Sequence, residues 1–418
     1  MPTGHDDLVL VTVDCWRTDG PRSMDSFLSR VEHCDRRDAI CQAPATRGAF
    51  PALLSGLYYP QAYAGYDDVR DDVRTLPEVL SDNGYTTGAV VGSNPFLSAW
   101  EDRFEYFWND DLTFGGSDKS TQRHLSKLET VLDYARVRPR VTAEEVATRA
   151  QAWYDRTDPP RFLWMHLMDV HVPFLPGFRR GLREGLLDVF GAHYRFMQDP
   201  RSVSASDQHT LERLYWRSMD YLDEQMDAVL SVAPDAELVV TGDHGEEFDH
   251  GECGHARLYD ECIRVPLFAS PGVARGVADE PAVRHLDIPV ALLDSQGIEA
   301  PASWEVQSAR IDPWPAFSLN HSPMFERVYA SVRTRTHKVI KTFDEHRPMQ
   351  RPLSVEGYDL VADPGETTNR HEEGGTFRQL ERRLDEFLAR EDIRDNVLER
   401  PREQSGAVEE RLQALGYR

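Results

Sequence analysis

The sequence is short of lysine and has no long apolar stretch. Only four of its 418 residues are lysine, and arginine supplies the rest of the 47 basic side chains. The longest apolar run near the start, Leu8–Val13, is far too short to span a bilayer. No basic segment precedes this run, so it does not read as a secretory signal. We therefore expect a cytoplasmic protein without a membrane span.

Cysteine is also scarce, and its spacing argues against two common roles. The five cysteines contain no CxxC pair, and their odd number does not suit a complete disulfide framework. They are Cys15, Cys34, Cys41, Cys253 and Cys262. Thiols of a cytosolic protein stay reduced. The pattern favours a globular protein that is stabilised by its core rather than by cross-links.

Acidic residues are in large excess. Asp and Glu total 71 against 47 Lys and Arg, which gives a formal net charge of -24. An acidic surface that uses arginine in place of lysine is typical of proteins that work at high salt, where counterions screen the self-repulsion. We therefore expect a halophilic archaeal protein. The same negative field disfavours nucleic acid as a partner, because DNA binding needs clustered cations.

Short apolar strands alternate with amphipathic helices along most of the chain. The predicted strands are Leu8–Val13, Thr86–Val91, Phe162–Leu167, Glu237–Thr241 and Val265–Ala269. The predicted helices are Leu76–Gly84, Thr142 to about Tyr154, and roughly Asp207–Val232. This alternation is typical of a doubly wound, mostly parallel α/β sheet flanked by helices.

The pattern of predicted strands and helices changes past about residue 300. Three short strand-like pieces are followed by a charged helix: Val328–Val332, Lys338–Thr342, Tyr358–Val361 and Thr376–Arg390. We predict a catalytic α/β domain over residues 1–300 and a smaller α+β lobe over residues 301–418. The stretches 109–127 and 173–207 are predicted to be long connections, which are often lids or binding loops.

Side chains that can bind a cation follow three of the predicted strands. They are Asp14, His171 and the pair Asp243-His244. Ligand sites of doubly wound sheets form beyond the carboxyl ends of the strands, so we expect these residues to meet in space. Carboxylate oxygens and imidazole nitrogens suit a divalent cation. Asp-His pairs are also common in ordinary turns, and a solvated acidic loop would contain the neighbouring carboxylates as well.

The wider pattern resembles the sulfatase branch of the alkaline phosphatase superfamily. The segments that carry the resemblance are Val11–Asp19, Met168–Phe174, Thr241–His255, Tyr358–Leu360, Asp363–Asn369 and Arg411–Tyr417. They cover nearly the whole chain in matching order. The resemblance implies an α/β fold with a closing lobe, an enzyme that hydrolyses sulfate or phosphate esters, and a bound divalent cation (Ca, Mg, Mn or Zn).

The nucleophile position departs from that of sulfatases. They carry Cys or Ser in a Cys/Ser-x-Pro-x-Arg motif, ten positions before a Gly that follows Ser or Thr. That Gly is Gly56 here, and the residue ten positions before it is Thr46. Gly48 and Phe50 stand where the motif has Pro and Arg. Thr cannot become formylglycine, but a metal-activated Thr attacks phosphorus directly in related phosphodiesterases. Alternatively, Thr46 only caps the next helix. Cys41 fits the motif poorly, and we interpret it as a structural thiol.

The resemblance also implies a role for each site residue. The expected ligands of one divalent cation are Asp14, Thr46, Asp243 and His244. A second cation is left open, with Asp169, His171 and His255 as its ligands. In the single-cation case, His171 and His255 would donate hydrogen bonds to the substrate anion or protonate the leaving group.

Two further residues are candidates for substrate binding. Arg47 would clamp the anion bidentately, or it would be an ordinary surface arginine. Asn94 would line the pocket, although Asn-Pro is also a plain turn signal. Asp19, Asp169 and His250 are expected to support the site rather than to touch the substrate.

These features together predict a metal-dependent hydrolase of a small anionic ester, which could be linked to a sugar. Because Thr46 replaces an oxidisable Cys or Ser, phosphate mono- or diesters are favoured over sulfate esters. Two alternatives remain: a transferase that passes a phosphorylated head group to a sugar or lipid, and a catalytically silent relative that binds anions. The lack of membrane helices disfavours the first, and the retained metal ligands disfavour the second.

Overall fold

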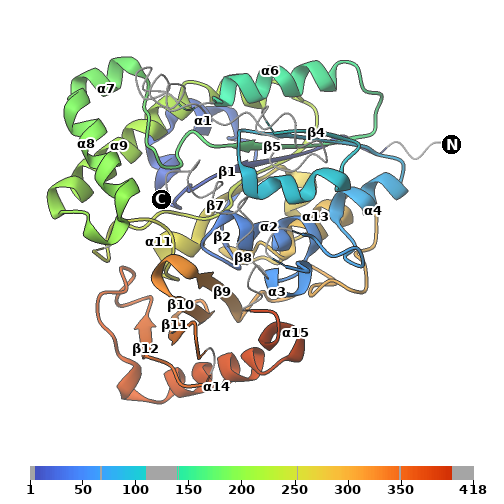
Figure 1. The fold of residues 1–418 in the computed structure, drawn as a ribbon. Coiled ribbons are helices and arrows are strands. Elements are labelled where there is room, and N and C mark those ends of the chain that lie inside the picture. Colours follow the sequence, from blue (N-terminus) through green and yellow to red (C-terminus); the bar gives the residue numbers. More distant parts are fainter. Residues whose placement is uncertain are drawn as a thin grey trace.

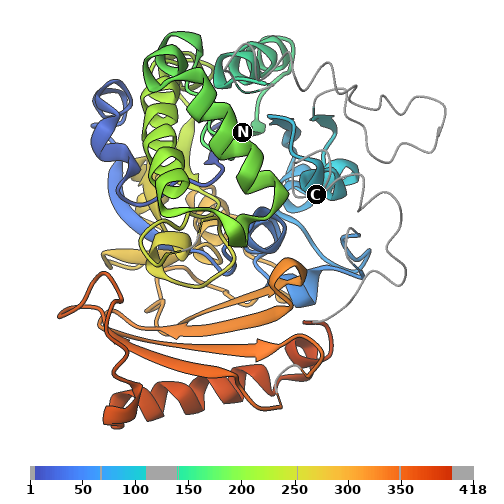
Figure 2. The same cartoon turned by 60° about the vertical axis from the view of Figure 1, so that its left-hand side comes forward.

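The computed structural model describes residues 5–65, 68–109, 139, 141–251, 253–347 and 350–397. A large sheet has helices on both faces, and a smaller antiparallel sheet with its own helix lies against one side of it (Figures 1 and 2). The predicted fold class, a mostly parallel α/β sheet with a smaller α+β lobe, is therefore confirmed. In the described part of the chain, no helix has both the length and the apolarity needed to cross a membrane.

The large sheet contains eight strands in the order β4-β3-β5-β1-β6-β7-β2-β8. Their bounds are β1 Leu8–Val13, β2 Asp35–Ile40, β3 Thr86–Val91, β4 Tyr106–Trp108, β5 Arg161–Leu167, β6 Glu237–Gly242, β7 Arg264–Ala269 and β8 Ala282–Arg284. Only β7 pairs antiparallel with both of its neighbours, and all other pairs are parallel. The carboxyl ends of β5, β1 and β6 therefore lie next to one another.

Strand β1 shows why the sheet is covered on both faces. All six of its residues are buried, and successive side chains enter opposite cores. On the Leu8 and Leu10 face lie α2 Thr46–Ser55, α3 Tyr59–Ala62, α4 Leu76–Asp82 and α13 Asp287–Ser295. On the Val9 and Val11 face lie α1 Asp25–Arg30, α6 Ala143–Tyr154, α9 Ala205–Asp223 and α10 Met226–Leu230.

The smaller sheet is an antiparallel meander in the order β12-β11-β10-β9. Its bounds are β9 Ala316–Ser322, β10 Arg327–Arg333, β11 His337–Asp344 and β12 Ser354–Asp359, and α14 Thr376–Leu388 packs on β10 and β11. Strand β9 joins the main domain, because the Leu319 amide donates to the Gln42 carbonyl over 2.9 Å. The boundary at residue 300 between two domains stays a prediction.

Two regions of the chain differ from the sequence prediction. The stretch 173–207 is not a plain connection, because it contains α7 Phe178–Glu184, α8 Leu186–Gln198 and η3 Pro200–Ser202. The single long helix predicted up to Val232 is broken between α9 and α10. The break lies at Gln225, whose side chain donates to Asp169 Oδ1 over 3.0 Å instead of facing solvent.

Several short helices complete the described chain. They are η1 Gly20–Ser23, η2 Pro95–Arg103, α11 Asp260–Ile263, α12 Pro271–Ala274, η4 Pro323–Phe325, η5 His371–Glu373 and α15 Glu391–Arg394. The other predicted connection lies outside the described residues beyond Asn109, as does the closing segment Arg411–Tyr417.

Candidate active site

Asp14 follows β1 at the point where two neighbouring strands also end. In the sheet register, Val13 pairs with Leu167 of β5 and with Gly242 of β6. Asp14 and Asp243 therefore leave the sheet side by side, and both are fully buried. The Asp14 amide donates to the Leu167 carbonyl over 2.9 Å, which fixes the start of the turn. Parallel pairing thus brings together two carboxylates that are far apart in the sequence.

Thr46 is the first residue of α2, and its hydroxyl points at this carboxylate pair. Oγ1 donates to Asp14 Oδ2 over 3.2 Å and lies 3.3 Å from His244 Nε2. The N-cap of α2 is Ala45, and no side chain caps the helix. The alternative that Thr46 serves as the helix cap is therefore wrong. Its position at a helix N-terminus puts free amides and the positive end of the helix dipole next to the hydroxyl.

His244 presents one ring nitrogen to the cluster. Its Nδ1 lies 2.8 Å from the Gly245 carbonyl, so Nδ1 holds the proton and Nε2 keeps its lone pair. Nε2 lies 3.4 Å from Asp14 Oδ1 and 3.6 Å from Asp243 Oδ2. Among the described residues, buried Oδ2 of Asp243 finds no hydrogen-bond donor. The cluster therefore combines a free imidazole lone pair with an unsatisfied carboxylate oxygen.

These groups fit a divalent cation. Ligand atoms of Asp14, Asp243 and His244 all lie within 4.8 Å of one another, and all three residues are buried. Two carboxylates and one imidazole form a donor set that suits Ca, Mg, Mn or Zn. A buried carboxylate oxygen without a partner is costly unless a cation or a proton satisfies it. The residues present therefore match the cation that the sequence implies.

The two buried carboxyls differ in their acidity. Burial and the nearby Asp14 charge raise the pKa of Asp243 well above its usual range. Burial would also raise the pKa of Asp14, but His171, His166 and His244 outweigh it and hold that pKa well below its usual range. Burial and the His255 charge lower the pKa of His244 to about 3. Adjacent buried carboxyls cannot both ionise cheaply, so a bound cation would relieve this repulsion.

His171 and His255 lie on the outer side of this cluster. Their ring centroids are 5.9 Å apart, and the His255 centroid lies 4.5 Å from that of His244. His255 Nδ1 lies 3.4 Å from Glu246 Oε2. Burial alone would lower the pKa of His255, but the Glu246 charge outweighs it and raises that pKa. Burial lowers the pKa of His171, so His255 is the more basic of the two imidazoles.

Asn94 belongs to the cluster, whereas Arg47 contacts residues outside it. The Asn94 amide donates to Asp14 Oδ2 over 3.1 Å, and its oxygen accepts from the Phe96 amide as the cap of η2. The Asn94 side chain therefore contacts the cluster and also stabilises the turn that begins η2. The Arg47 guanidinium donates to the Gly65 carbonyl over 3.0 Å and lies 4.7 Å from the Tyr63 ring centroid. A role in clamping the anion stays a prediction.

Two residues of the cluster were missed by the sequence reasoning. His166 lies inside β5, fully buried, with Nε2 3.4 Å from Asp14 Oδ2. Cys15 follows Asp14 with a φ of 57°, and its thiol donates to Asp14 Oδ1 over 3.2 Å. Left-handed backbone at a residue other than glycine is costly and often marks a functional turn. The signal that could have revealed Cys15 is its position at a strand end, directly after a predicted ligand.

The supporting residues contact structural partners. Asp169 accepts from Gln225 over 3.0 Å, and burial raises its pKa to about 7. Its contact with Gln225 favours a structural role over a place among the ligands of a second cation. Asp19 pairs with Arg17 at 3.0 Å. Cys41 is buried with Sγ 3.6 Å from His285 Nε2, which agrees with a structural thiol.

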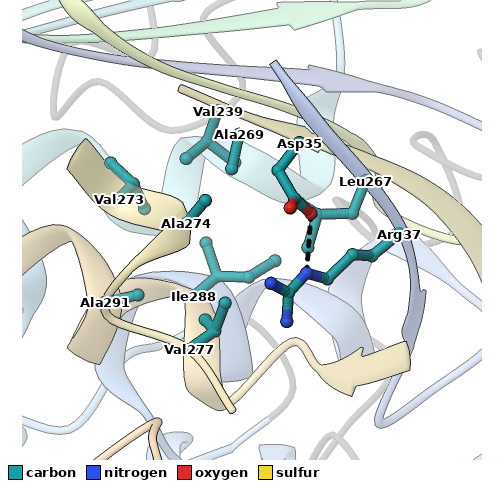
Figure 3. Close-up of a pocket in the computed structure, with 10 residues that line it drawn as sticks. All are labelled: Asp35, Arg37, Val239, Leu267, Ala269, Val273, Ala274, Val277, Ile288 and Ala291. Carbon is teal, nitrogen blue, oxygen red and sulfur yellow. Dashed lines mark hydrogen bonds and ion pairs between the residues drawn. The ribbon is translucent and has the colours of Figure 1, made fainter. Parts of the chain in front are cut away.

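A small cavity lies away from this cluster, beside the start of β6 and the end of β7 (Figure 3). Apolar side chains such as Val239, Leu267 and Ile288 line it, and the ion pair of Asp35 with Arg37 stands at its side. Its volume of about 10 Å³ holds no more than one water. None of its lining residues belongs to the cluster around Asp14, so it has no place in the chemistry described above.

Comparison with solved structures shows that the fold is widely shared. A 2-O GAG sulfatase superposes with a TM-score of 0.67 at 16% identity, covering 94% of each chain. The phosphonate monoester hydrolase of Agrobacterium radiobacter superposes with a TM-score of 0.62 at 16% identity, covering 94% of this chain and 96% of its own.

A third structure was solved in complex with its substrate, D-glucosamine-2-N,6-O-disulfate. It gives a TM-score of 0.65 at 14% identity, covering 96% of this chain and all of the other. No curated protein matches the sequence. The family described as Sulfatase matches residues 36–298, which is more than half of the chain. The chain therefore belongs to the sulfatase family and is an enzyme that hydrolyses sulfate or phosphate esters.

Proposed function

We propose that the enzyme is a metal-dependent hydrolase of phosphate mono- or diesters with Thr46 as its nucleophile. The observation that supports this most directly is the direction of the Thr46 hydroxyl. Oγ1 lies 3.2 Å from Asp14 Oδ2 and 3.3 Å from His244 Nε2, and it leaves the helix amides of α2 uncapped. The N-cap of α2 is Ala45, so the Thr46 hydroxyl is not used to cap the helix and is left to the cluster.

The cation would be held by Asp14, Asp243 and His244, with Thr46 Oγ1 as a further ligand. When bound, a divalent cation lowers the pKa of a coordinated hydroxyl and neutralises negative charge that develops on the phosphoryl group. The chain's own contribution is orientation. Asp14 Oδ2 accepts the hydroxyl hydrogen bond, and Gly245 fixes the tautomer that leaves His244 Nε2 free.

The reaction then proceeds in two balanced steps. Thr46 Oγ1 gives its proton to Asp14 Oδ2, the acceptor of its hydrogen bond, and forms a bond to phosphorus. The ester P–O bond breaks, and the leaving oxygen takes a proton from His255. Water next attacks phosphorus and gives a proton to His255, while the bond to Oγ1 breaks and Oγ1 takes its proton back from Asp14 Oδ2. Glu246 supports this role because it lies 3.4 Å from His255 Nδ1 and favours the protonated ring, which leaves Nε2 to serve the leaving group.

Three side chains are assigned to substrate binding. His171 is assigned to a free oxygen of the anion, and its buried ring beside His255 supports that assignment. Because its Nδ1 bonds the Val172 carbonyl, its Nε2 donates to the anion only when the ring carries a second proton. Asn94 is held by its bond to Asp14 at the edge of the same cluster. Arg47 would clamp the anion once its guanidinium leaves the Gly65 carbonyl, and a bidentate contact of this kind binds phosphate tightly.

The preference for phosphate over sulfate follows from the nucleophile. Thr46 cannot be oxidised to the aldehyde that sulfatases use, whereas an alkoxide can attack phosphorus without modification. The substrate is proposed to be a small anionic ester that could be linked to a sugar. That part of the proposal is supported by the structural neighbour whose bound substrate is a sulfated glucosamine.

We also propose that the enzyme works in a cytoplasm of high salt. All five cysteines are free thiols, which suits a reducing compartment. The net charge of -24 and the near absence of lysine suit abundant counterions.

The proposal is tested with three variants and three nitrophenyl substrates: the phosphate, the bis-phosphate and the sulfate. Thr46→Ala should lose at least about a thousandfold in kcat on the phosphates, whereas Thr46→Ser should keep a measurable fraction because it retains a hydroxyl. Thr142→Ala serves as the matched control, since the Thr142 side chain caps α6 and bonds Glu145 rather than a residue of the cluster, so its loss should lower stability but not turnover. Full activity in Thr46→Ala, or faster turnover of the sulfate than of either phosphate, would contradict the proposal.

A further inference from the structure

His250 lies at the outer end of the segment that carries the site residues, and both of its ring nitrogens face oxygens. The segment is closed by a backbone bridge between Glu247 and Gly254, directly before His255. His250 Nδ1 is hydrogen-bonded to Glu261 Oε1, and Nε2 lies 3.3 Å from the Glu366 carbonyl. Neither oxygen can donate, so both contacts are made only when both ring nitrogens carry protons. The geometry therefore describes an imidazolium.

The surroundings of the ring agree with a positive charge. It stacks on Tyr259 with the centroids 3.7 Å apart and an angle of 1° between the planes. Arg257 contacts the His250 carbonyl rather than its ring. The acidic groups around the ring are Glu261, Glu366 and Glu247. Burial would lower the pKa of His250, but Glu261 outweighs it and raises that pKa above its usual value.

Glu366 belongs to the C-terminal lobe and is held there firmly. Its backbone is left-handed, with a φ of 53°, and its side chain is buried although it lies in a turn. Oε1 lies 2.7 Å from Lys338 Nζ of β11, and Oε2 accepts from the Asp260 amide at the start of α11. Asp260 in turn pairs with Arg333 at 2.7 Å. The carbonyl that receives His250 is thus fixed by buried ion pairs between the lobe and α11.

Glu261 fixes the other end of the contact, in the main domain. Its Oε2 accepts from the Phe248 amide over 2.8 Å, from the Asp249 amide over 2.9 Å and from Arg17 over 3.0 Å. Arg17 also donates to the Glu246 carbonyl over 3.3 Å, and Glu246 is the partner of His255. A continuous set of hydrogen bonds therefore runs from the lobe through His250 to the backbone of Glu246, whose side chain contacts His255.

We propose that His250 is a positioning residue that, as an imidazolium, ties the C-terminal lobe to the segment carrying Glu246 and His255. When the ring loses a proton, one of its two bonds is lost and the segment is held less tightly. The inference rests on the proposed role of His255 in proton transfer. It gives the lobe a part in catalysis through a contact outside the cluster around Asp14.

The test compares His250→Gln with His371→Gln. His371 is the matched control, because its ring pairs with Glu381 at 2.9 Å, and both residues lie within the lobe. We expect His250→Gln to lower kcat about tenfold or more with a smaller change in KM, as lost support of a catalytic group does. His371→Gln should keep the kcat of the wild type. Equal losses in both variants, or no loss in either, would overturn the inference.

A second readout does not depend on turnover. Because the pKa of His250 is raised in the folded state, its stabilising contribution is present below the usual histidine pKa and disappears as pH rises through the folded value. The difference in Tm between wild type and His250→Gln should therefore be large at pH 6 and shrink at alkaline pH. A difference in Tm that does not change with pH overturns the inference that His250 ties the lobe as an imidazolium. If Thr46→Ala keeps its activity while this pH dependence is seen, the proposed function fails, and the inference that His250 ties the lobe to the segment stands.

Discussion

At the scale of single residues, the site is built from groups that oppose one another in the absence of a cation. Asp14 and Asp243 are fully buried neighbours, and the charge of one raises the pKa of the other. Such an arrangement costs stability and is retained where function requires it. The residues that serve binding should therefore be the ones whose replacement stabilises the metal-free protein.

The variant Asp243→Asn tests this trade-off. It removes the repulsion, so we expect the metal-free protein to gain about 1 kcal/mol of unfolding free energy while it loses turnover. A cation at a hundredfold its Kd should stabilise the wild type by about 2.7 kcal/mol and leave the variant unchanged. Thermal unfolding with and without chelator measures both effects.

The control for this prediction is Asp287→Asn, a second buried carboxyl. Asp287 pairs with Arg284 at 2.7 Å, so its replacement should destabilise the protein and leave the response to metal intact. A metal-free Asp243→Asn protein that is less stable than wild type would show that the two carboxyls are not in conflict.

The sequence was enough to predict part of this site. Asp14 and Asp243 follow apolar strands, and parallel pairing puts such residues at one edge of a sheet. His166 could not be found in that way, because it lies inside a strand whose pattern is otherwise apolar. Its approach to Asp14 depends on the register between β5 and β1, which local sequence does not encode.

At the scale of elements, the buried strands were predictable and the charged ones were not. β1 and β3 have the predicted bounds, because a strand buried on both faces shows as an apolar run. β2 contains the charged residues Asp35, Arg36, Arg37 and Asp38, so it does not show as an apolar run and was not predicted as a strand. Asp38 is paired with Arg264 from a distant segment, and Arg37 is paired with Asp35 within the strand.

The junction between α11 and the lobe gives an element-scale prediction. Burial would raise the pKa of Asp260, but Arg333 and Lys338 hold it well below its usual range. Asp260 therefore stabilises the fold above the usual aspartate pKa, and this contribution is lost as pH falls through the folded value. Asp260→Asn should cost about 3 kcal/mol at neutral pH, and the difference from wild type should shrink in acid.

Urea unfolding of both proteins between neutral and acidic pH measures that difference. Asp363→Asn is a suitable control, because Asp363 is only half-buried and accepts from the Thr367 and Thr368 amides of the nearby turn. A cost for Asp260→Asn that stays constant down to the most acidic pH would contradict the ion-pair explanation.

At the scale of the whole molecule, charge is the dominant feature. The formal net charge is -24, and both lysines in the described part, Lys338 and Lys341, are buried in the lobe. Within the described ranges, the basic side chains at the surface are therefore arginines, and several pair with carboxylates, as Arg70 does with Asp72 and Arg335 with Glu280. Self-repulsion of the remaining acidic groups opposes the compact state and is screened by salt.

We therefore expect the Tm to rise steeply as the KCl concentration increases. At about 0.15 M the Debye length is already about 8 Å, so isolated pairs are screened, and we expect the rise to continue at higher concentrations. Sucrose, which favours burial without screening charge, should act more weakly. Replacing the exposed acids Glu101 and Asp102 by lysine should reduce the salt dependence. A Tm that is insensitive to KCl would contradict adaptation to high salt.

The most direct test of the central claim is to look for phosphate on Thr46. The metal-loaded enzyme is mixed with nitrophenyl phosphate, quenched in acid during turnover, digested and analysed by mass spectrometry. The mechanism predicts a phosphoryl group on the peptide that contains Thr46, at the Thr46 oxygen, and its absence from Thr46→Ala. Turnover of the phosphate ester with no phosphorylated Thr46 at any quench time, or with the phosphoryl group on another residue, would contradict the assignment of Thr46 as nucleophile.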